Sequence, residues 1–310
     1  MNMKRPLVSV VIPTRNRPEL VCRAVKSALG QTYEEIEVVV VVDGPDQSTV
    51  LSLTELSNPR IKIIALEKNV GGSDARNIGA QKASGDWIAF LDDDDEWVPE
   101  KIERQVSLAA TLDHPNAFIS CKFVDRTSNQ EAIAPSRKPR LGERIDEFLS
   151  ETSIQTSTIL AQRELVLRSP FVSGLKRGQE FTWMVRACNC AGAQFYVVPE
   201  VLSMFNGGAH SDGQRISLEA KWESLYDWAQ RNRSLFTVHS YSALIVFRIL
   251  PDMLACGERS LNMARILVSY LLSGSCNLYH LTYFLFRWLC PRKLQLTLKS
   301  WRRPTNAATC

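Results

Sequence analysis

Four consecutive aspartates, Asp92, Asp93, Asp94 and Asp95, follow an apolar stretch of the chain. Carboxylates this close repel one another, so their full ionisation is costly unless a cation neutralises them. Oxygen ligands suit Mg²⁺ or Mn²⁺, and Mg²⁺ commonly takes one or two carboxylates and completes its shell with water and substrate phosphates. The cluster therefore indicates a divalent metal that binds a diphosphate ligand. The alternative is that these acids only cap the following helix.

Two other apolar stretches also end in polar residues. The first ends in the Pro-Thr-Arg-Asn-Arg run of residues 13–17, which offers hydroxyl, amide and guanidinium groups. The second ends in Asp43 and Gly44. An acid at that position can accept a hydrogen bond from a base N–H, such as the imide of uracil, while the glycine lets the backbone approach closely. The alternative is that Asp43, Gly44 and Pro45 simply form a turn.

Residues 69–79 pair a glycine turn, Gly71 and Gly72, with the expected start of a helix. Free backbone N–H groups at a helix N-terminus favour anions. Arg76 adds a planar, permanently charged side chain to this segment. It either pairs with Asp43 or with the acidic cluster, or contacts a nucleotide directly or through those acids. The glycines match neither the dinucleotide fingerprint nor a P-loop, so they are weak evidence by themselves.

Strands and helices alternate through this part of the sequence. Apolar or β-branched runs predict strands over residues 7–13, 36–42, 61–66 and 87–91. Helical spacing of apolar residues predicts helices over 18–29, 46–57 and 73–83, the last capped by Ser73. Strands that are apolar on both faces belong inside a parallel sheet covered by helices. The alternation predicts an α/β fold with a doubly wound, mostly parallel sheet, which binds ligands at the carboxyl ends of its strands, where the polar runs fall.

The second half of the chain follows a different pattern. The sequence predicts a helix over 99–111 and a strand over 117–124, then a basic, proline-containing stretch over 126–140, where we place a soft boundary. Further strands are expected over 154–160, 193–198 and 201–205, with a helix over 180–188, and everything beyond Leu218 is helical in pattern. We divide the chain into residues 1–125, 126–215 and 216–310.

Size and composition fit a folded enzyme. With 310 residues, 45% of them hydrophobic and 23% charged, the chain can bury a sizeable core as one large α/β domain with an appendage, or as two small domains. The apolar run after Lys4 and Arg5 stops at Pro13 and is too short for a signal-peptide core. The eight cysteines lack paired CxxC spacing, which favours a reducing cytoplasm over a zinc site or a disulfide scaffold.

The C-terminal region is basic and apolar. After Glu258 the sequence contains no Asp or Glu, and residues 266–286 carry no formal charge. Serines and other polar residues interrupt this stretch, so a single membrane span is not expected. We interpret it either as a pair of helices packed on the catalytic domain, or as helices lying on the bilayer surface with the basic tail against anionic lipid. No nucleic-acid-binding module is recognisable, so nucleic acid is not an expected partner.

Three segments together resemble glycosyltransferase family 2, which has the GT-A fold. They read VSVVIPTRNRPELVCRAVKSALGQTY, VVVDG and NVGGSDARNIGAQKASGDWIAFLDDDDEW, and the resemblance covers most of residues 6–115. It implies a nucleotide-diphosphate sugar donor, usually a UDP-sugar, a Mg²⁺ or Mn²⁺ ion held by the Asp-x-Asp element, and inversion at the anomeric carbon. It also implies that residues 1–125 bind the donor, and that residues 126–215 bind the acceptor and supply the catalytic base.

The resemblance assigns roles to individual residues by their position. The metal falls on Asp92 and Asp94, with Asp94 as the direct ligand. The nucleotide sugar falls on residues drawn from the polar strand ends and the glycine segment: Pro13, Thr14, Asn16, Asp43, Arg76, Asp92 and Asp93.

Inversion by direct displacement needs a general base on the face opposite the leaving diphosphate. The family usually supplies it from a Glu-Asp pair that opens a helix, and residues 178–186 resemble that segment with Gln179 and Glu180 in place of the pair. Glu180 is therefore the expected base; the alternative is a first-turn glutamate that only favours the helix dipole. His210, in a glycine-containing loop, is either a diphosphate or metal contact or a plain surface residue.

These residues predict an inverting, metal-dependent glycosyltransferase that acts on a glycan or lipid-linked acceptor in cell-envelope polysaccharide biosynthesis. The enzyme is expected in the cytoplasm, either free or peripheral at the cytoplasmic face of the membrane. Two alternatives stay open. A nucleotidyltransferase would want a glycine-rich phosphate loop after the first strand, which residues 13–16 lack. A degenerate nucleotide-sugar-binding protein would have kept the fold and lost the base.

Overall fold

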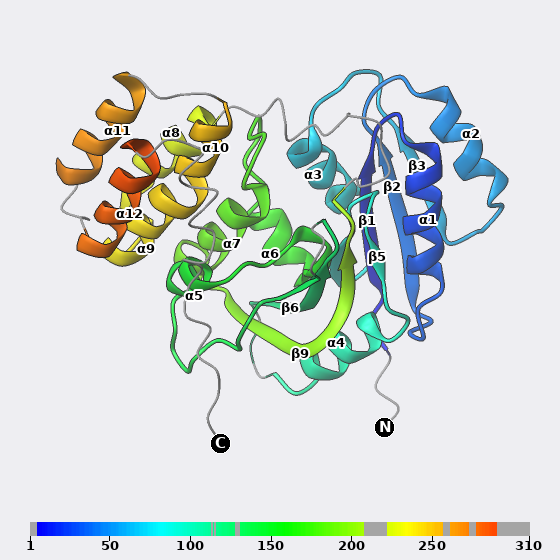
Figure 1. Cartoon of the computed structure of the whole chain (residues 1–310). Helices are drawn as coiled ribbons and strands as arrows, with labels where there is room; N and C mark the ends of the chain where they lie inside the picture. The colour runs from blue at the N-terminus through cyan, green and yellow to red at the C-terminus, as the bar shows by residue number, and fades with distance from the viewer. Residues whose placement is uncertain are drawn as a thin grey trace. The chain divides into compact units, whose positions relative to one another are not determined.

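A computed structural model of the chain describes residues 5–112, 114, 116–127, 131–207, 222–256, 261–272 and 277–289. The chain forms two compact units, Met1–Ala220 and Lys221–Cys310. The first contains a sheet flanked by helices, and the second is helical in every element that the structure describes (Figure 1).

The sheet of the first unit has nine described strands. Eight of them lie in the order β3-β2-β1-β4-β8-β6-β9-β5, and β7 pairs with β6. Strands β3, β2, β1 and β4 are parallel, as are β6 and β9, whereas β8 runs antiparallel to β4 and β6. This arrangement confirms the predicted α/β fold with a doubly wound, mostly parallel sheet. The strands are β1 Val8–Thr14, β2 Ile36–Val42, β3 Ile61–Ala65, β4 Trp87–Phe90, β5 Glu96–Trp97, β6 Ala117–Asp125, β7 Ala132–Ala134, β8 Leu160–Gln162 and β9 Gln194–Phe205.

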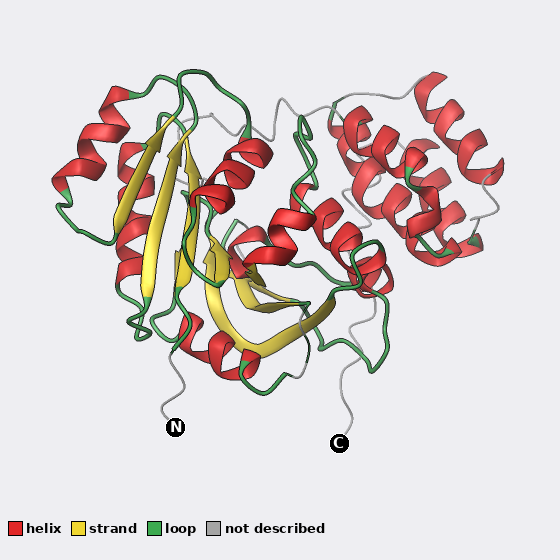
Figure 2. Cartoon of the chain, turned by 180° about the vertical axis from the view of Figure 1, so that it is seen from behind, coloured by secondary structure: helices red, strands yellow, loops and turns green. Residues whose placement is uncertain are grey.

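Helices cover both faces of the parallel strands (Figure 2). Val8 of β1 shares one core cluster with Val21 and Val25 of α1, whereas α3 packs on the other side of the sheet. There Gly79 lies so close to Val11 that a Cβ atom added to the glycine would overlap the valine side chain. Because helices close both faces, every residue of β1 is buried, Ser9 included, as the largely apolar run predicts. The helices of this unit are α1 Pro18–Leu29, α2 Gln47–Glu55, α3 Gly72–Lys82, α4 Lys101–Ala109, α5 Ile145–Glu151, α6 Arg163–Arg168 and α7 Gln179–Asn189.

The prediction of a strand over residues 154–160 is wrong. A 3₁₀ turn, Thr156–Thr158, lies in the middle of this stretch, and β8 begins only at Leu160. The Thr158 hydroxyl donates to the carbonyl of Gln155 (2.7 Å), and the Ser157 hydroxyl donates to Asp95 (2.5 Å). Such side-chain hydrogen bonds compete with strand pairing, and the apolar pattern of the sequence does not reveal them.

The two strands predicted over residues 193–198 and 201–205 form one continuous strand, β9. Its register against β6 shifts, so that Cys121 pairs with Val198 while the next residue, Lys122, pairs with Val201. The two residues between these valines are therefore accommodated as a bulge, which increases the bend of a strand without ending it. Figure 2 shows β9 as a strongly curved strand that passes under the second half of the sheet.

The second unit is built from short helices around an apolar core. Val246, Ile249 and Met253 are fully buried there. Within residues 266–286, the structure describes two helices, as the expected pair requires. Within the described residues, none of the helices combines the length and the apolar character needed to cross a bilayer. The elements are α8 Glu223–Arg231, the 3₁₀ helix η3 Arg233–Leu235, α9 Val238–Leu244, the π-helix η4 Ile245–Ile249, α10 Leu250–Ala255, α11 Leu261–Leu272 and α12 Leu278–Leu289.

Candidate active site

Three neighbouring parallel strands end at the same edge of the sheet, and polar residues lie at all three ends. Thr14 is the last residue of β1, Asp43 follows β2, and Asp92 comes shortly after β4. The Thr14 hydroxyl donates a hydrogen bond to Asp93 (2.8 Å), and the backbone N–H of Asp43 donates to the carbonyl of Thr14 (2.8 Å). The structure therefore brings together the strand ends on which the sequence analysis placed the nucleotide and the metal.

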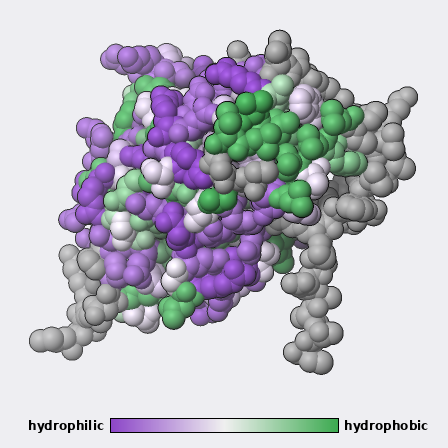
Figure 3. Space-filling view, turned by 90° about the vertical axis from the view of Figure 1, so that its left-hand side faces the viewer, coloured by the Kyte–Doolittle hydropathy of each residue, from purple (hydrophilic) through white to green (hydrophobic). Residues whose placement is uncertain are grey.

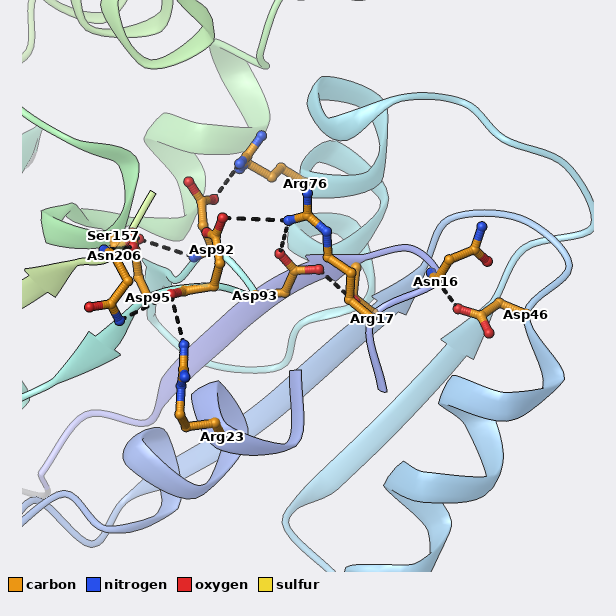
Figure 4. A network of polar contacts seen from close by, with 12 residues as sticks. Asn16, Arg17, Arg23, Asp46, Arg76, Asp92, Asp93, Asp95, Ser157 and Asn206 are labelled. Carbon is orange, nitrogen blue, oxygen red and sulfur yellow. Dashed lines mark hydrogen bonds and ion pairs between the residues drawn. The ribbon is translucent and has the colours of Figure 1, made fainter. Parts of the chain in front are cut away.

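The first three aspartates of the acidic run pair with arginines (Figure 4). Arg76 forms an ion pair with Asp92, and Arg17 forms ion pairs with Asp93 (3.0 Å) and Asp94 (3.4 Å). The side chains of Asp92 and Asp94 remain 25% and 17% exposed, whereas that of Asp93 is nearly enclosed. Asp92 and Asp94 are therefore the accessible acids of the run.

Asp95 has a structural role in this cluster. Its buried carboxylate accepts hydrogen bonds from the Ser157 hydroxyl (2.5 Å) and from the backbone N–H of Asn206 (3.0 Å). The side-chain amide of Asn206 also donates to the carbonyl of Asp94 (3.1 Å). These contacts join the acidic run to the residues before β8 and after β9. The sequence analysis missed Ser157 and Asn206, because no spacing in the chain links them to an aspartate that lies far away in sequence.

Burial and mutual repulsion raise the pKa values of three of these acids. Burial, together with the charge of Asp94, raises the pKa of Asp93 to about 6. Burial and the charge of Asp92 raise the pKa of Asp94, and burial and the charge of Asp94 hold the pKa of Asp95 well above its usual value. Arg17 lowers the pKa of Asp93 and Asp94 but does not cancel the increase. The cluster thus carries more negative charge than its arginines neutralise, and an added cation would bind favourably.

Asp43 organises the glycine segment before α3. Its buried carboxylate accepts hydrogen bonds from the backbone N–H groups of Val70 (2.7 Å) and Gly71 (2.9 Å) and from the side-chain amide of Asn69 (3.0 Å). Gly71 is the N-cap residue of α3 and has a φ of +89°, a backbone conformation that glycine adopts without steric cost. The helix has no side-chain cap, so the predicted Ser73 cap is wrong.

Pro13 and Asn16 lie on either side of Thr14. Pro13 is buried inside β1, in register with Val41 of β2. Asn16 is exposed, and its backbone N–H donates to Asp46 (2.6 Å), which in turn caps α2 by accepting from the N–H of Thr49 (3.1 Å). The turn after β1 is therefore fixed against the start of α2.

Arg76 connects the acidic run to the second half of the chain. Besides its ion pair with Asp92, it donates a hydrogen bond to the side-chain oxygen of Gln179 (2.6 Å), and its guanidinium lies over the ring of Phe171, 5.7 Å from the centroid. A Cβ atom added to Gly72 would come within 3.1 Å of the Arg76 guanidinium, so the glycine leaves room for it. Of the two acidic partners that the sequence left open, the structure joins Arg76 to the acidic cluster.

The expected base lies next to this connection. Gln179 is the first residue of α7, and its side-chain amide donates to the carbonyl of Leu175 (2.6 Å) while its oxygen accepts from Arg76. Glu180 follows in the first turn of α7 and is half-buried. Glu180 therefore lies one residue from a side chain that contacts the arginine of the acidic cluster. His210 lies outside the described residues.

The carboxylates of the site can hold a metal ion only together with other ligands. Among the residues that the structure describes, no group of three or more His, Cys, Asp or Glu side chains is arranged to hold a metal ion. Asp92 and Asp94 offer the one or two carboxylates that Mg²⁺ commonly takes from a protein, and water and substrate phosphates supply the rest of its shell. The two acids thus fit Mg²⁺ or Mn²⁺ in the presence of a phosphate-bearing ligand.

The fold and this edge of the sheet are those of an α/β enzyme with the GT-A fold. Residues 9–169 match the family described as Glycosyl transferase family 2. The match covers just over half of the chain, and the chain belongs to this family. It is a glycosyltransferase, and the nucleotidyltransferase alternative is set aside.

Curated relatives agree with this assignment. The chain is 26% identical over 277 residues to the amylovoran biosynthesis glycosyltransferase AmsB of Erwinia amylovora, an alignment that covers 85% of this chain and 91% of the relative. It is 36% identical over 165 residues to the putative teichuronic acid biosynthesis glycosyltransferase TuaG of Bacillus subtilis, which covers 52% of this chain and 64% of that protein.

Solved structures agree on the fold. A crystal structure of residues 1–349 of Staphylococcus aureus TarS in complex with UDP-GlcNAc superimposes with a TM-score of 0.59 at 20% identity, covering 94% of this chain and 83% of that TarS fragment. The mannosyltransferase PcManGT of Pyrobaculum calidifontis, solved with GDP-Man and Mn²⁺, gives a TM-score of 0.56 at 14% identity, with 97% and 89% coverage. At these identities the likeness concerns the fold alone.

Proposed function

We propose that this glycosyltransferase moves a sugar from a nucleotide-diphosphate donor to a hydroxyl group of a glycan or lipid-linked acceptor, with inversion at the anomeric carbon. The observation that carries the proposal is the position of Arg76, which contacts Asp92 in the acidic run and Gln179 beside Glu180. Inversion needs one group near the leaving diphosphate and another near the acceptor hydroxyl. A single side chain links the candidates for these two roles.

The proposed donor is a UDP-sugar bound by residues 1–125, with Pro13, Thr14 and Asn16 at the end of β1 lining its nucleotide. A carboxylate offers about four acceptor positions. The glycine segment uses three of those on Asp43, which leaves one for the N–H of the base. Two further likenesses support a UDP donor. TarS has been solved with UDP-GlcNAc and with UDP. The Escherichia coli UDP-Glc:alpha-D-GlcNAc-diphosphoundecaprenol beta-1,3-glucosyltransferase WfgD is 38% identical over 102 residues, 33% of this chain and 40% of that protein.

Asp94 is the proposed direct metal ligand, with Asp92 beside it. A bound Mg²⁺ or Mn²⁺ ion offsets the negative charge that develops on the leaving diphosphate. Asp93 is engaged by Thr14 and Arg17 (2.8 and 3.0 Å), so we assign it to ordering the donor side of the site. His210 stays a candidate diphosphate or metal contact.

Glu180 is the proposed catalytic base. It takes the proton of the acceptor hydroxyl as the oxygen forms a bond to the anomeric carbon, and the bond between that carbon and the diphosphate oxygen breaks with its electron pair passing to the diphosphate. Its half-buried place at the start of α7, beside Gln179, supports this role. Residues 126–215 are proposed to bind the acceptor.

Polysaccharide biosynthesis in the cytoplasm is the proposed context. The names of several relatives concern amylovoran, succinoglycan and teichuronic acid biosynthesis. WfgD, whose name gives a diphosphoundecaprenol acceptor, supports a lipid-linked acceptor for this chain too. The cysteines that the structure reports as free, Cys22, Cys121, Cys188, Cys190 and Cys256, fit a reducing compartment.

A donor screen tests the proposal. The purified chain is incubated with a panel of nucleotide sugars in Mn²⁺, in Mg²⁺ and with chelator, and release of the nucleoside diphosphate is followed. Turnover of one UDP-sugar that disappears with chelator is the expected result. If a donor is bound but not turned over with either metal, the chain is a degenerate binding protein, and if no donor is bound at all, the proposal is overturned. Nuclear magnetic resonance of the product then gives its anomeric configuration, and retention would overturn the proposed inversion.

A further inference from the structure

Helices α11 and α12 each bury one face inside the second unit. Met263, Ile266 and Tyr270 of α11 are buried, and so are His280 and Phe284 of α12. The spacing of three or four residues within each set places it on one side of its helix. These inner faces account for how the two helices are held in the unit.

The inner faces are fixed by a buried polar contact as well as by packing. The hydroxyl of Ser242, on α9, lies 2.5 Å from the hydroxyl of Tyr270 and 2.5 Å from Nδ1 of His280. The Tyr270 hydroxyl also accepts from the backbone N–H of Asn277 (3.0 Å). Since α11 and α12 share this anchor, their other faces turn away from the core of the unit.

The outer faces of the same helices are apolar too. Leu272, Leu278 and Leu289 are 82%, 76% and 69% exposed. Spacings of three or four residues in α11, and of seven, eight and eleven residues in α12, again gather the exposed side chains on one side of each helix. Figure 3 shows apolar surface gathered on the side of the molecule that faces the viewer. We call this the outer apolar face: Val268, Leu271, Leu272, Leu278, Tyr279, Phe286 and Leu289.

The charged residues in and after this part of the sequence are all basic. From residue 259 to the end of the chain there is no Asp or Glu, whereas eight Lys or Arg residues occur. Two of these belong to the helices themselves, Arg265 of α11, which is exposed, and Arg287 of α12. A second copy of the chain would bring its own Arg265 and Arg287 against these two, and like charges would repel. A partner that is both apolar and negatively charged is complementary to it.

We propose that the outer apolar face rests on a bilayer surface that contains anionic lipid. Exposed apolar side chains of an interfacial helix enter the boundary between headgroups and acyl chains, while basic residues contact the anionic headgroups. Each Lys or Arg near such a surface adds to the attraction. This mode of binding requires no helix that crosses the bilayer. Although it suits a lipid-linked acceptor, the inference does not depend on the proposed reaction.

Vesicle sedimentation tests this inference with the full chain. Wild-type protein is mixed with vesicles of phosphatidylcholine alone, or with about a third of the lipid replaced by phosphatidylglycerol, and the bound fraction is measured. We expect binding to the anionic vesicles and little to the neutral ones. The double variant Leu272→Glu/Leu289→Glu should reduce the partition coefficient at least about tenfold, because it replaces apolar contacts with charges that the surface repels. The matched control Leu51→Glu changes an exposed leucine of α2 and should bind as wild type does.

Three outcomes overturn the inference. Wild-type protein that stays in the supernatant with anionic vesicles has no affinity for such a surface. A double variant that binds like Leu51→Glu shows that the outer apolar face is not the contact. Sedimentation velocity that reveals a dimer in the wild type and a monomer in the double variant, without vesicle binding, identifies a second copy as the occupant. Circular dichroism of each variant verifies folding, and donor turnover, measured separately, keeps failure of the proposed function distinct from failure of this inference.

Discussion

Arg76 and Gln179 lie 103 residues apart in the sequence, and their side chains are joined by a hydrogen bond of 2.6 Å. Because Arg76 also pairs with Asp92, one guanidinium reaches from the acidic run after β4 to the first residue of α7. The proposed metal-binding acids and the proposed base are thus positioned through a common residue. Displacing Gln179 should disturb both.

Replacement of Gln179 by Met should reduce activity without unfolding the protein. Methionine has nearly the same length but cannot replace the glutamine oxygen as acceptor for Arg76. A hydrogen bond to a charged group contributes about 1.5–3 kcal/mol. We therefore expect kcat/KM for the donor to fall roughly tenfold to a hundredfold. Steady-state kinetics measure this, with Gln81→Met, an exposed position of α3, as the matched control. Equal kcat/KM values for the two variants would show that the hydrogen bond between Arg76 and Gln179 does not contribute to activity.

Replacing Asp94 by alanine should affect turnover, whereas replacing its neighbour Asp95 should affect stability. Asp94→Ala should abolish metal-dependent turnover while leaving the melting temperature unchanged or higher, because a crowded charge is removed. Asp95→Ala removes the acceptor of the Ser157 hydroxyl and of the Asn206 N–H, and should lower the free energy of unfolding by about 2–4 kcal/mol. Urea denaturation and donor turnover of both variants give the comparison. Normal turnover by Asp94→Ala would falsify the metal role.

Glu180→Gln distinguishes a base from a helix-dipole residue. If Glu180 accepts the proton, kcat should fall by about two to four orders of magnitude while the KM for the donor changes little. If it only favours the dipole of α7, the change costs about 0.3–1 kcal/mol of stability and leaves kcat intact. Glu164→Gln, a first-turn glutamate of the short helix α6, is the control. Single-turnover measurement keeps product release out of the comparison.

The stability of the protein should increase between pH 7 and pH 9 because of Lys101. This residue is fully buried, its ammonium group lies 4.0 Å from the centroid of the Trp97 ring, and it donates to the Gln105 side chain (2.7 Å). Burial lowers its pKa from 10.5 to about 8. Between these two values the unfolded chain binds more protons than the folded one, so raising the pH favours the folded state. Over this pH interval the contribution is about 1 kcal/mol.

Comparison with Lys101→Met isolates that contribution. Burial raises the pKa of Cys121 to about 11, so this thiol opposes the trend at alkaline pH. Cys121 has this effect in both the wild type and the variant. The difference between their free energies of unfolding therefore gives the contribution of Lys101. From pH 7 to pH 9, the free energy of unfolding measured by urea titration should rise more for the wild type than for the variant. Parallel pH profiles would mean that Lys101 titrates normally.

The local pattern of apolar residues was sufficient to predict the framework of strands in the first half of the chain. The strands β1, β2 and β4 were predicted because their runs are almost entirely apolar, a pattern typical of strands in a sheet that helices cover on both faces. Once those strands were parallel neighbours, Thr14, Asp43 and Asp92 had to meet at one edge. The candidate site could therefore be located before its geometry was known.

The same pattern was not sufficient to predict the elements of the second half of the chain. The 3₁₀ turn Thr156–Thr158 replaces a predicted strand because the hydroxyl of Ser157 donates to Asp95 and that of Thr158 lies 2.8 Å from the Ser120 hydroxyl, contacts that depend on the surrounding structure. The bulge in β9 likewise depends on its register against β6. Both features come from tertiary partners, which hydrophobic spacing does not record.

The acidic run shows most clearly which features the sequence determines and which only the tertiary structure decides. The sequence by itself determined that four carboxylates follow a buried strand and that so many charges need a cation, since covalent proximity forces their repulsion. Only the tertiary structure decided that Asp95 is occupied by Ser157 and Asn206, that Asp92 pairs with Arg76, and that Asp92 and Asp94 keep accessible surface. These partners lie far apart in the chain, and distance in space, which sets the strength of a hydrogen bond or ion pair, is fixed only by the packing of the sheet and its helices.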